Sequence, residues 1–172
     1  MMLELSASDL VGHLNCRHLT NLDLAVAEGR LAKPQVWDPL LDILRERGAR
    51  HEQGFVDHLV NAGYEVTVIN GVTGGENAAS QTISAMRSGA DIIVQGVLQS
   101  DCRRSRTDVL RKISAASRLG PRSYEVVDTK LAQATKGGTV LQLCFYSDLV
   151  GSVPGTHARA HLCGDSMDEL PT

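Results

Sequence analysis

The spacing of apolar residues predicts one long amphipathic helix and several shorter ones. From Asp38-Pro39, apolar residues recur at steps of three and four as far as Leu59. Asp38 is a suitable N-cap, Pro39 fits the first helical position, and Gly63 ends the helix. His51 lies on the apolar face of this helix. Further helices are predicted from Ser6 onwards and over residues 20–28, 77–87 and 138–150.

Shorter stretches, several of them rich in β-branched and aromatic residues, predict strands. They cover residues 64–69, 90–98, 106–113 and 124–131, with a last short strand over 157–163. We expect the second and third of these strands to pair as a hairpin through the polar loop at residues 100–105. Helices that alternate with strands in this order indicate an α/β fold.

The strand at 124–131 carries the most informative polar residues. Side chains alternate along a strand, so Asp128 and Lys130 point to the same face as Tyr124 and Val126. Both charged groups are costly to bury, so they need either mutual pairing or a ligand. A partly buried ion pair is the simpler interpretation of this pattern, and a catalytic site is the alternative.

A second carboxylate strengthens the catalytic interpretation. Asp108 lies near the start of the preceding strand, 20 positions before Asp128, and shares a face with Leu110. Two carboxylates on adjacent antiparallel strands can share a Mg²⁺ ion, which prefers oxygen ligands and keeps several waters. Such an ion activates a water for attack on a phosphate, and Lys130 could orient that water. His51 would complete the metal shell.

The composition of the chain limits its domain count and its possible partners but does not identify a function. With 172 residues and 42% hydrophobic content, the chain suits one domain with a real core. We expect a helical segment at residues 1–37, the core at 38–163 and a tail at 164–172. The net charge of −3 gives no global attraction to nucleic acid, so such binding needs a local basic surface. Basic residues do cluster, at Arg103, Arg104, Arg106, Arg111 and Lys112.

The four cysteines and the N-terminus indicate where the protein resides. The cysteines are widely spaced, and the start of the chain lacks the basic flank and apolar run of a secretory signal. No apolar run reaches the ~18 residues of a membrane span. We therefore expect a cytoplasmic protein with free thiols and no membrane contact. His13, Cys16 and His18 form an incomplete zinc set, and the glycine-rich loop at 71–75 lacks the lysine of a phosphate-binding loop.

Taken in order, the singled-out residues resemble a known family. His51, Asp108, Asp128-Thr129-Lys130 and the stretch from Gln142 to Tyr146 follow the motif order of RecB-like nucleases of the PD-(D/E)XK superfamily. The N-terminal Ser-x-Ser-Asp-Leu and Cys-Arg-His-Leu-Thr segments also look like bacterial predicted RecB-family nucleases. Those proteins often continue into an RNase H-like domain and sometimes a helicase, which are the partner domains that the resemblance implies.

The resemblance implies a restriction-endonuclease-like α/β core, a central mixed β-sheet flanked by helices. It implies Mg²⁺ or Mn²⁺ held by His51, Asp108, Asp128 and the Thr129 carbonyl. Asp108, Asp128 and Lys130 would be the catalytic residues. Gln142 and Tyr146 would contact the DNA strand near the scissile phosphate. The implied activity is phosphodiester hydrolysis on single-stranded DNA or DNA ends, in DNA repair or processing.

Two departures from the family pattern keep other functions open. Ser105 stands where the family has a glycine before the strand aspartate. Among the cysteines, Cys16 fits the early position of an iron-sulphur ligand set but only Cys163 follows the core, so we do not expect a cluster, and Cys102 and Cys144 are expected to be buried. The alternatives are a catalytically degenerate nucleic-acid-binding or assembly module, and a truncated fragment of a larger nuclease-helicase.

Overall fold

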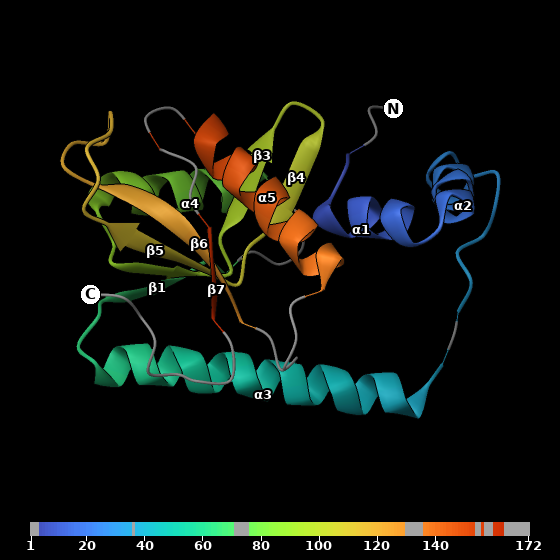
Figure 1. The fold of residues 1–172 in the computed structure, drawn as a ribbon, viewed down its shortest axis with the longest axis horizontal. Coiled ribbons are helices and arrows are strands. Elements are labelled where there is room, and N and C mark those ends of the chain that lie inside the picture. Colours follow the sequence, from blue (N-terminus) through green and yellow to red (C-terminus); the bar gives the residue numbers. More distant parts are fainter. Residues whose placement is uncertain are drawn as a thin grey trace.

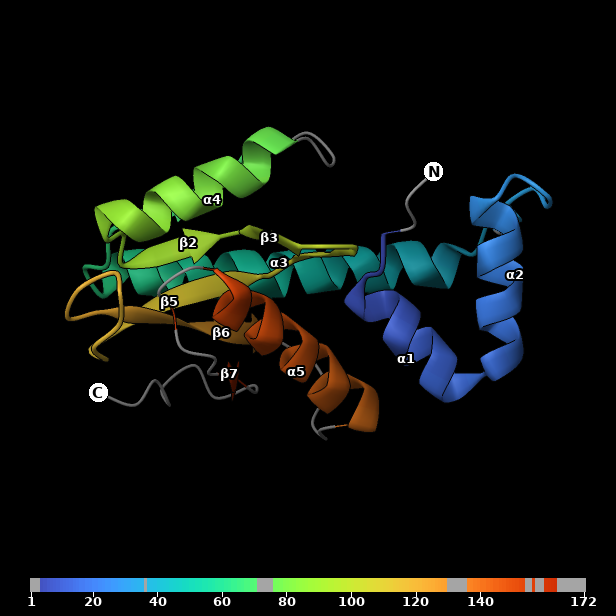
Figure 2. The ribbon, with the colours of Figure 1, turned by 90° about the horizontal axis from the view of Figure 1, so that it is seen from above.

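The centre of the protein is a mixed five-stranded sheet with helices on both faces (Figures 1 and 2). The computed structural model describes residues 4–35, 37–70, 76–129, 136–153, 156 and 160–163. The strand order is β1-β2-β5-β6-β7. These strands are β1 Val66–Val68, β2 Ile92–Val94, β5 Val109–Ile113, β6 Ser123–Thr129 and β7 Ala160–Cys163.

Strand directions define the mixed character of the sheet. β5 is antiparallel to both of its neighbours, β2 and β6, whereas the outer strands β1 and β7 run parallel to β2 and β6. The antiparallel β2, β5 and β6 form the centre, so β5 and β6 are buried between two helical layers. The predicted α/β class, with a central mixed sheet flanked by helices, is confirmed.

The helices form the two outer layers. They are α1 Ala7–Asn15, α2 Arg17–Ala27, α3 Pro39–Asn61, α4 Glu76–Ser88 and α5 Gly137–Ser152. In Figure 1, α3 runs beneath the sheet, and α4 and α5 lie above it. The predicted start of α3 is confirmed, because the Asp38 side chain accepts a 2.9 Å hydrogen bond from the backbone N–H of Leu40. Its end is confirmed too, with Gly63 in the left-handed region at φ 90°.

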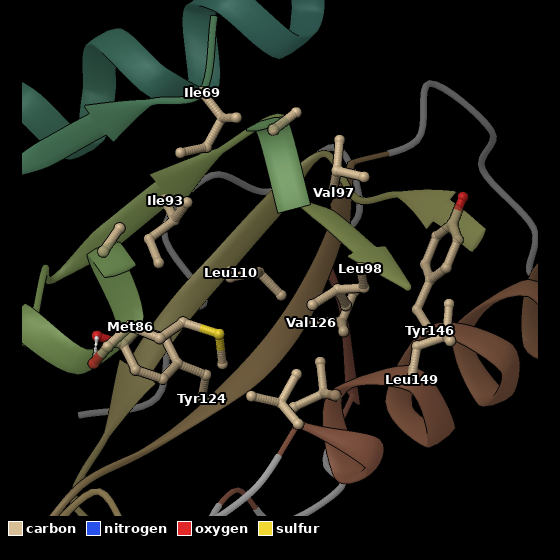
Figure 3. Close-up of a cluster of buried hydrophobic side chains, with 14 of the residues drawn as sticks. Ile69, Met86, Ile93, Val97, Leu98, Leu110, Tyr124, Val126, Tyr146 and Leu149 are labelled. Atoms are coloured by element: carbon tan, nitrogen blue, oxygen red, sulfur yellow. Dashed lines mark hydrogen bonds between the residues drawn. The ribbon is translucent and has the colours of Figure 1, made fainter. Parts of the chain in front are cut away.

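Each face of the sheet has its own apolar layer, and β6 divides its side chains between them. Tyr124 and Val126 pack with α4 and α5, and Figure 3 shows part of this layer. Val127 points the other way and packs with Phe55 and Leu59 of α3. The alternation predicted for this strand is therefore confirmed for the described side chains.

The strand predicted over residues 90–98 is wrong in one respect, because it is broken in the middle. Gln95 has a left-handed φ of 57° and Gly96 follows, so β2 ends and a separate hairpin of β3 (Val97–Ser100) and β4 (Arg103–Arg106) begins. A Cβ on Gly96 would lie 2.9 Å from Cδ1 of the buried Leu110, so a larger residue here would force the Leu110 side chain to shift. The predicted hairpin exists, but the break divides it between two sheets.

Two expectations about helix faces are also wrong. Cys144 of α5, expected to be buried, is exposed, while the core-facing residues are Leu143, Phe145, Tyr146, Leu149 and Val150. Because α5 is apolar on nearly every side, its sequence pattern does not select one buried face. In α3, Leu40 and Leu44 are exposed and burial begins only at Phe55. The second helix starts at Arg17 rather than at residue 20.

The N-terminal segment packs onto the core. The N–H of Leu5 donates to the Cys102 carbonyl at 2.7 Å, and the Arg104 N–H donates to the Leu5 carbonyl at 2.9 Å. Gly138 of α5 lies against Val11 of α1, where an added Cβ would be 3.1 Å from Cγ1 of Val11. These contacts tie residues 4–15 to the β3–β4 hairpin and to α5. No helix in the described ranges combines the length and apolarity needed to cross a membrane.

Candidate active site

Asp108 and Asp128 lie at the same end of the β5–β6 pair. Val109 and Val127 are directly opposite each other in this antiparallel ladder. Asp108 precedes Val109 and Asp128 follows Val127, so the two aspartates occupy neighbouring positions across the strands. The structure thus brings together two carboxylates that are 20 positions apart in the sequence.

Tyr146 of α5 reaches the same end of the sheet. It is almost fully buried, and burial raises the pKa of its phenol. Hydrogen bonds with Gln142 and Ser105 act in the opposite direction, and the negative charges of Asp108 and Asp128 raise the pKa further. The last two effects require that both carboxylates lie within electrostatic range of the hydroxyl. Tyr146 lies at the margin of the apolar cluster, with its hydroxyl pointing away from Leu149 (Figure 3).

Gln142 and Tyr146 form a pair on one side of α5, as their four-residue spacing predicts. The Gln142 side-chain amide donates a 2.6 Å hydrogen bond to the Tyr146 hydroxyl. Both residues predicted to contact a nucleic acid are therefore at the carboxylate end of the sheet. The contact with DNA itself stays a prediction.

Glu52 of α3, the neighbour of the predicted ligand His51, contacts Gln95 at the edge of this region. The Glu52 carboxylate accepts a hydrogen bond from the Gln95 side chain. The Gln95 backbone N–H in turn donates to the Asp108 carbonyl at 2.8 Å. His51 is half-buried on α3, which covers the sheet face opposite to α5. Glu52 is thus linked to Asp108 through one intervening residue.

Asp108 and Asp128 can hold a hard cation only if water or phosphate oxygens complete its coordination. Within the described ranges, no three or more His, Cys, Asp and Glu side chains lie close enough together to hold a metal ion. Two neighbouring carboxylates still fit Mg²⁺, which proteins commonly bind through one or two carboxylates plus water and phosphate oxygens. Of the other predicted residues, Lys130 lies outside the described residues, and for Thr129 only the backbone, which pairs with Cys163, is described.

Most of the basic cluster is engaged in ion pairs rather than presented to solvent. Arg103 pairs with Asp148 of α5, Arg104 with Glu4, Arg111 with Glu125, and Lys112 with Asp91. The Lys112 ammonium lowers the pKa of the Asp91 carboxyl. Arg106 is exposed at the end of β4, two positions before Asp108.

The sequence did not predict that Ser105, Gln95 and Glu52 lie near the two carboxylates or the residues beside them. Ser105 departs from the family pattern, and in the structure it lies near enough to Tyr146 to lower the pKa of the phenol. Gln95 could have been suspected from the glycine that follows it, because Gly within a strand pattern often marks a break. For Glu52 the sequence carries no signal beyond its place beside His51.

Comparison with known proteins adds no relative. No protein-family model, no curated protein and no solved structure matches the chain. The function of this protein therefore has to be inferred from its own residues.

Proposed function

We propose that the chain is a metal-dependent deoxyribonuclease with a restriction-endonuclease-like core related to the RecB-like nucleases. The observation that supports this most is the meeting of Asp108, Asp128, Gln142 and Tyr146 at one end of the β5–β6 pair. Tyr146 and Gln142 supply neutral hydrogen-bonding groups at the end of the sheet that carries the two carboxylates, and this combination suits a metal-bound phosphate.

Asp108 and Asp128 would hold Mg²⁺ or Mn²⁺. The ion would supply a bound water of lowered pKa and would neutralise charge that develops on the phosphate. Asp128 is 1% exposed, so its position is fixed by the core strand before any substrate arrives. Tyr146 keeps its proton at neutral pH, because its pKa is raised, and so serves as a neutral donor to a phosphate oxygen. The assignment of Lys130 as the residue that orients the water rests on the family resemblance.

Cleavage of a labelled single-stranded oligodeoxynucleotide with Mg²⁺ or Mn²⁺ tests this proposal. We expect cleavage by the wild-type chain that chelation abolishes, and a loss of at least about 100-fold for Asp108→Asn and for Asp128→Asn. Asp101→Asn is the matched control, because it makes the same charge change at an exposed hairpin position where Asn tolerates the left-handed φ of 52°. Equal cleavage by all four proteins would refute the proposal.

A second candidate is a nucleic-acid-binding module without catalysis. The described side chains offer two neighbouring carboxylates rather than a three-ligand group, which favours this reading over a complete metal centre. This candidate predicts binding that weakens with salt, no cleavage, and no effect of Asp128→Asn on affinity. Whether a helicase or an RNase H-like domain works with this chain stays a prediction from the resemblance.

A further inference from the structure

The central sheet breaks beside Asp108. The regular pairing of β2 with β5 ends at Val94 and Val109, and the next two residues that face each other are Gln95 and Asp108. The Gln95 N–H donates to the Asp108 carbonyl at 2.8 Å. Beyond this point the chain enters the separate β3–β4 hairpin. Gln95 therefore holds the backbone of Asp108 at the junction between the two sheets.

The side chain of Gln95 lies on the α3 side of this junction. Ile93, two positions earlier, packs in the layer formed with α4 and α5 (Figure 3). In a continuous strand, Gln95 would lie on that same face. The left-handed φ of 57° ends the alternation, and the Gln95 side-chain amide donates to the carboxylate of Glu52 in α3. The break thus directs this side chain to the opposite face of the sheet.

The conformation of Gln95 is unfavourable for a residue with a long side chain. In the left-handed region the Cβ crowds the backbone, so Gly and Asn are its usual occupants. Non-glycine residues persist there when their surroundings hold them, and such residues cluster at active sites. Gln95 is held from two sides, by Glu52 at its side chain and by the Asp108 carbonyl at its N–H. Asn would suit the backbone better but is one methylene shorter, so the glutamine points to the contact with Glu52.

We propose that Gln95 is a positioning residue, which is held by Glu52 of α3 and keeps the carboxylate of Asp108 beside that of Asp128. The ligand of the two carboxylates is a divalent cation, so the inference rests on the proposed nuclease function. Gln95 acts through the backbone of Asp108 rather than by contact with the cation, because the bond from its N–H fixes the point at which β5 begins.

Replacing Gln95 by Asn separates positioning from a contribution to stability. Asn suits the left-handed backbone but is too short to reach Glu52, so Gln95→Asn should bind Mn²⁺ about 10-fold more weakly in calorimetry without a lower urea midpoint. Asp101→Asn is the matched control, because it places Asn at a second left-handed position, with φ 52°, and should leave Mn²⁺ affinity unchanged. A lower urea midpoint with unchanged Mn²⁺ affinity in Gln95→Asn would make Gln95 a purely structural residue and overturn the proposal.

A double-mutant cycle tests whether Glu52 acts through Gln95. Glu52→Ala should weaken Mn²⁺ binding about as much as Gln95→Asn, and the double variant should bind no more weakly than the worse single variant. Glu46→Ala removes an exposed carboxylate of the same helix and controls for the loss of one negative charge. Losses that multiply in the double variant would show that Glu52 acts on the cation independently of Gln95, against the proposal.

Hydrogen exchange separates failure of this inference from failure of the proposed function, since it needs neither metal nor substrate. We expect Glu52→Ala to speed exchange of the Gln95 backbone N–H at least about 10-fold. The Ile92 N–H, at the other end of β2 and bonded to the Glu65 carbonyl at 3.1 Å, reports any general loss of stability and should not change. Faster exchange at Gln95 in a protein that neither binds Mn²⁺ nor cleaves DNA would support the positioning of Asp108 and refute the nuclease. An unchanged rate at Gln95 would overturn the inference, whatever the activity.

Discussion

The side-chain amide of Gln142 donates a 2.6 Å hydrogen bond to the hydroxyl of Tyr146, one turn further along α5. This bond keeps the phenol oxygen at the end of the sheet where Asp108 and Asp128 act on its pKa. We therefore expect the two side chains to act as one unit in any contact with a ligand.

This unit predicts non-additive effects on DNA binding. In an Asp128→Asn background, which prevents cleavage, Gln142→Leu and Tyr146→Phe should each weaken binding of a single-stranded oligodeoxynucleotide by about 5- to 10-fold. The double variant should bind no more weakly than the worse single variant, since each change already disrupts the pair. Fluorescence anisotropy at fixed salt measures these affinities. Independent, multiplying losses would show that Gln142 and Tyr146 act separately.

The break between β2 and β3 depends on Gly96. In Gly96→Ala, the new methyl would press on Leu110, which is fully buried, and on Thr107 and Thr82 at 3.3 Å. We expect a loss of about 1–3 kcal/mol in the free energy of unfolding, measured by urea denaturation. Gly48→Ala in α3 is the matched change, because nothing lies within 4 Å of its Cβ position and helix propensity should make it stabilising by about 0.5–1 kcal/mol. Equal effects at both sites would contradict the close packing around Gly96.

A buried ion pair links β5 and β6 on the α3 face of the sheet. Nε of Arg111 donates to Oε1 of Glu125 at 2.7 Å, and both residues are buried. Arg111→Met should destabilise the protein by about 3–5 kcal/mol, because it leaves a buried carboxylate without this guanidinium. Replacing both partners, as in Arg111→Met with Glu125→Leu, should recover most of that loss. If the double variant were as unstable as Arg111→Met alone, the unpaired carboxylate of Glu125 would not be the cause of the lost stability, and this account would be contradicted.

The buried phenol of Tyr124 should make the free energy of unfolding fall at alkaline pH. Burial raises its pKa to about 12, and its hydroxyl donates to the Ala90 carbonyl at 2.8 Å. The pKa of Tyr124 in the folded protein exceeds the unfolded value of about 10. Its contribution to the free energy of unfolding is therefore complete below pH ~10 and is lost as the pH rises through about 12. The full effect is on the order of 2–3 kcal/mol. Urea denaturation at increasing pH should show a decline that is shallower in Tyr124→Phe; identical slopes would contradict this assignment.

Local signals in the sequence were enough to predict much of this fold. The Asp38 cap, the glycine that ends α3 and the alternation in β6 all depend on neighbours within a few residues, and all three are confirmed. Periodicity did not predict the break at Gln95, because apolar residues stand on both sides of Gln95-Gly96 as in one strand, and the only local signal was the glycine. The buried face of α5 was equally hidden, since its sequence is apolar on nearly every side.

The candidate site shows the same division between local and long-range information. The spacing of Gln142 and Tyr146 predicts their contact, and the strand pattern predicts the approach of Asp108 to Asp128. Ser105 and Tyr146 are 41 positions apart, and their proximity depends on how the β3–β4 hairpin leaves the sheet. Only the tertiary structure carries that information.

Calorimetric titration of Mn²⁺ into the protein tests the central claim most directly, because it asks whether Asp108 and Asp128 together bind a cation. The wild type and the Asp101→Asn control should bind about one or two ions, and Asp108→Asn and Asp128→Asn should each abolish that binding. Indistinguishable Mn²⁺ binding by all four proteins would contradict the claim and leave the two carboxylates without a metal-dependent role.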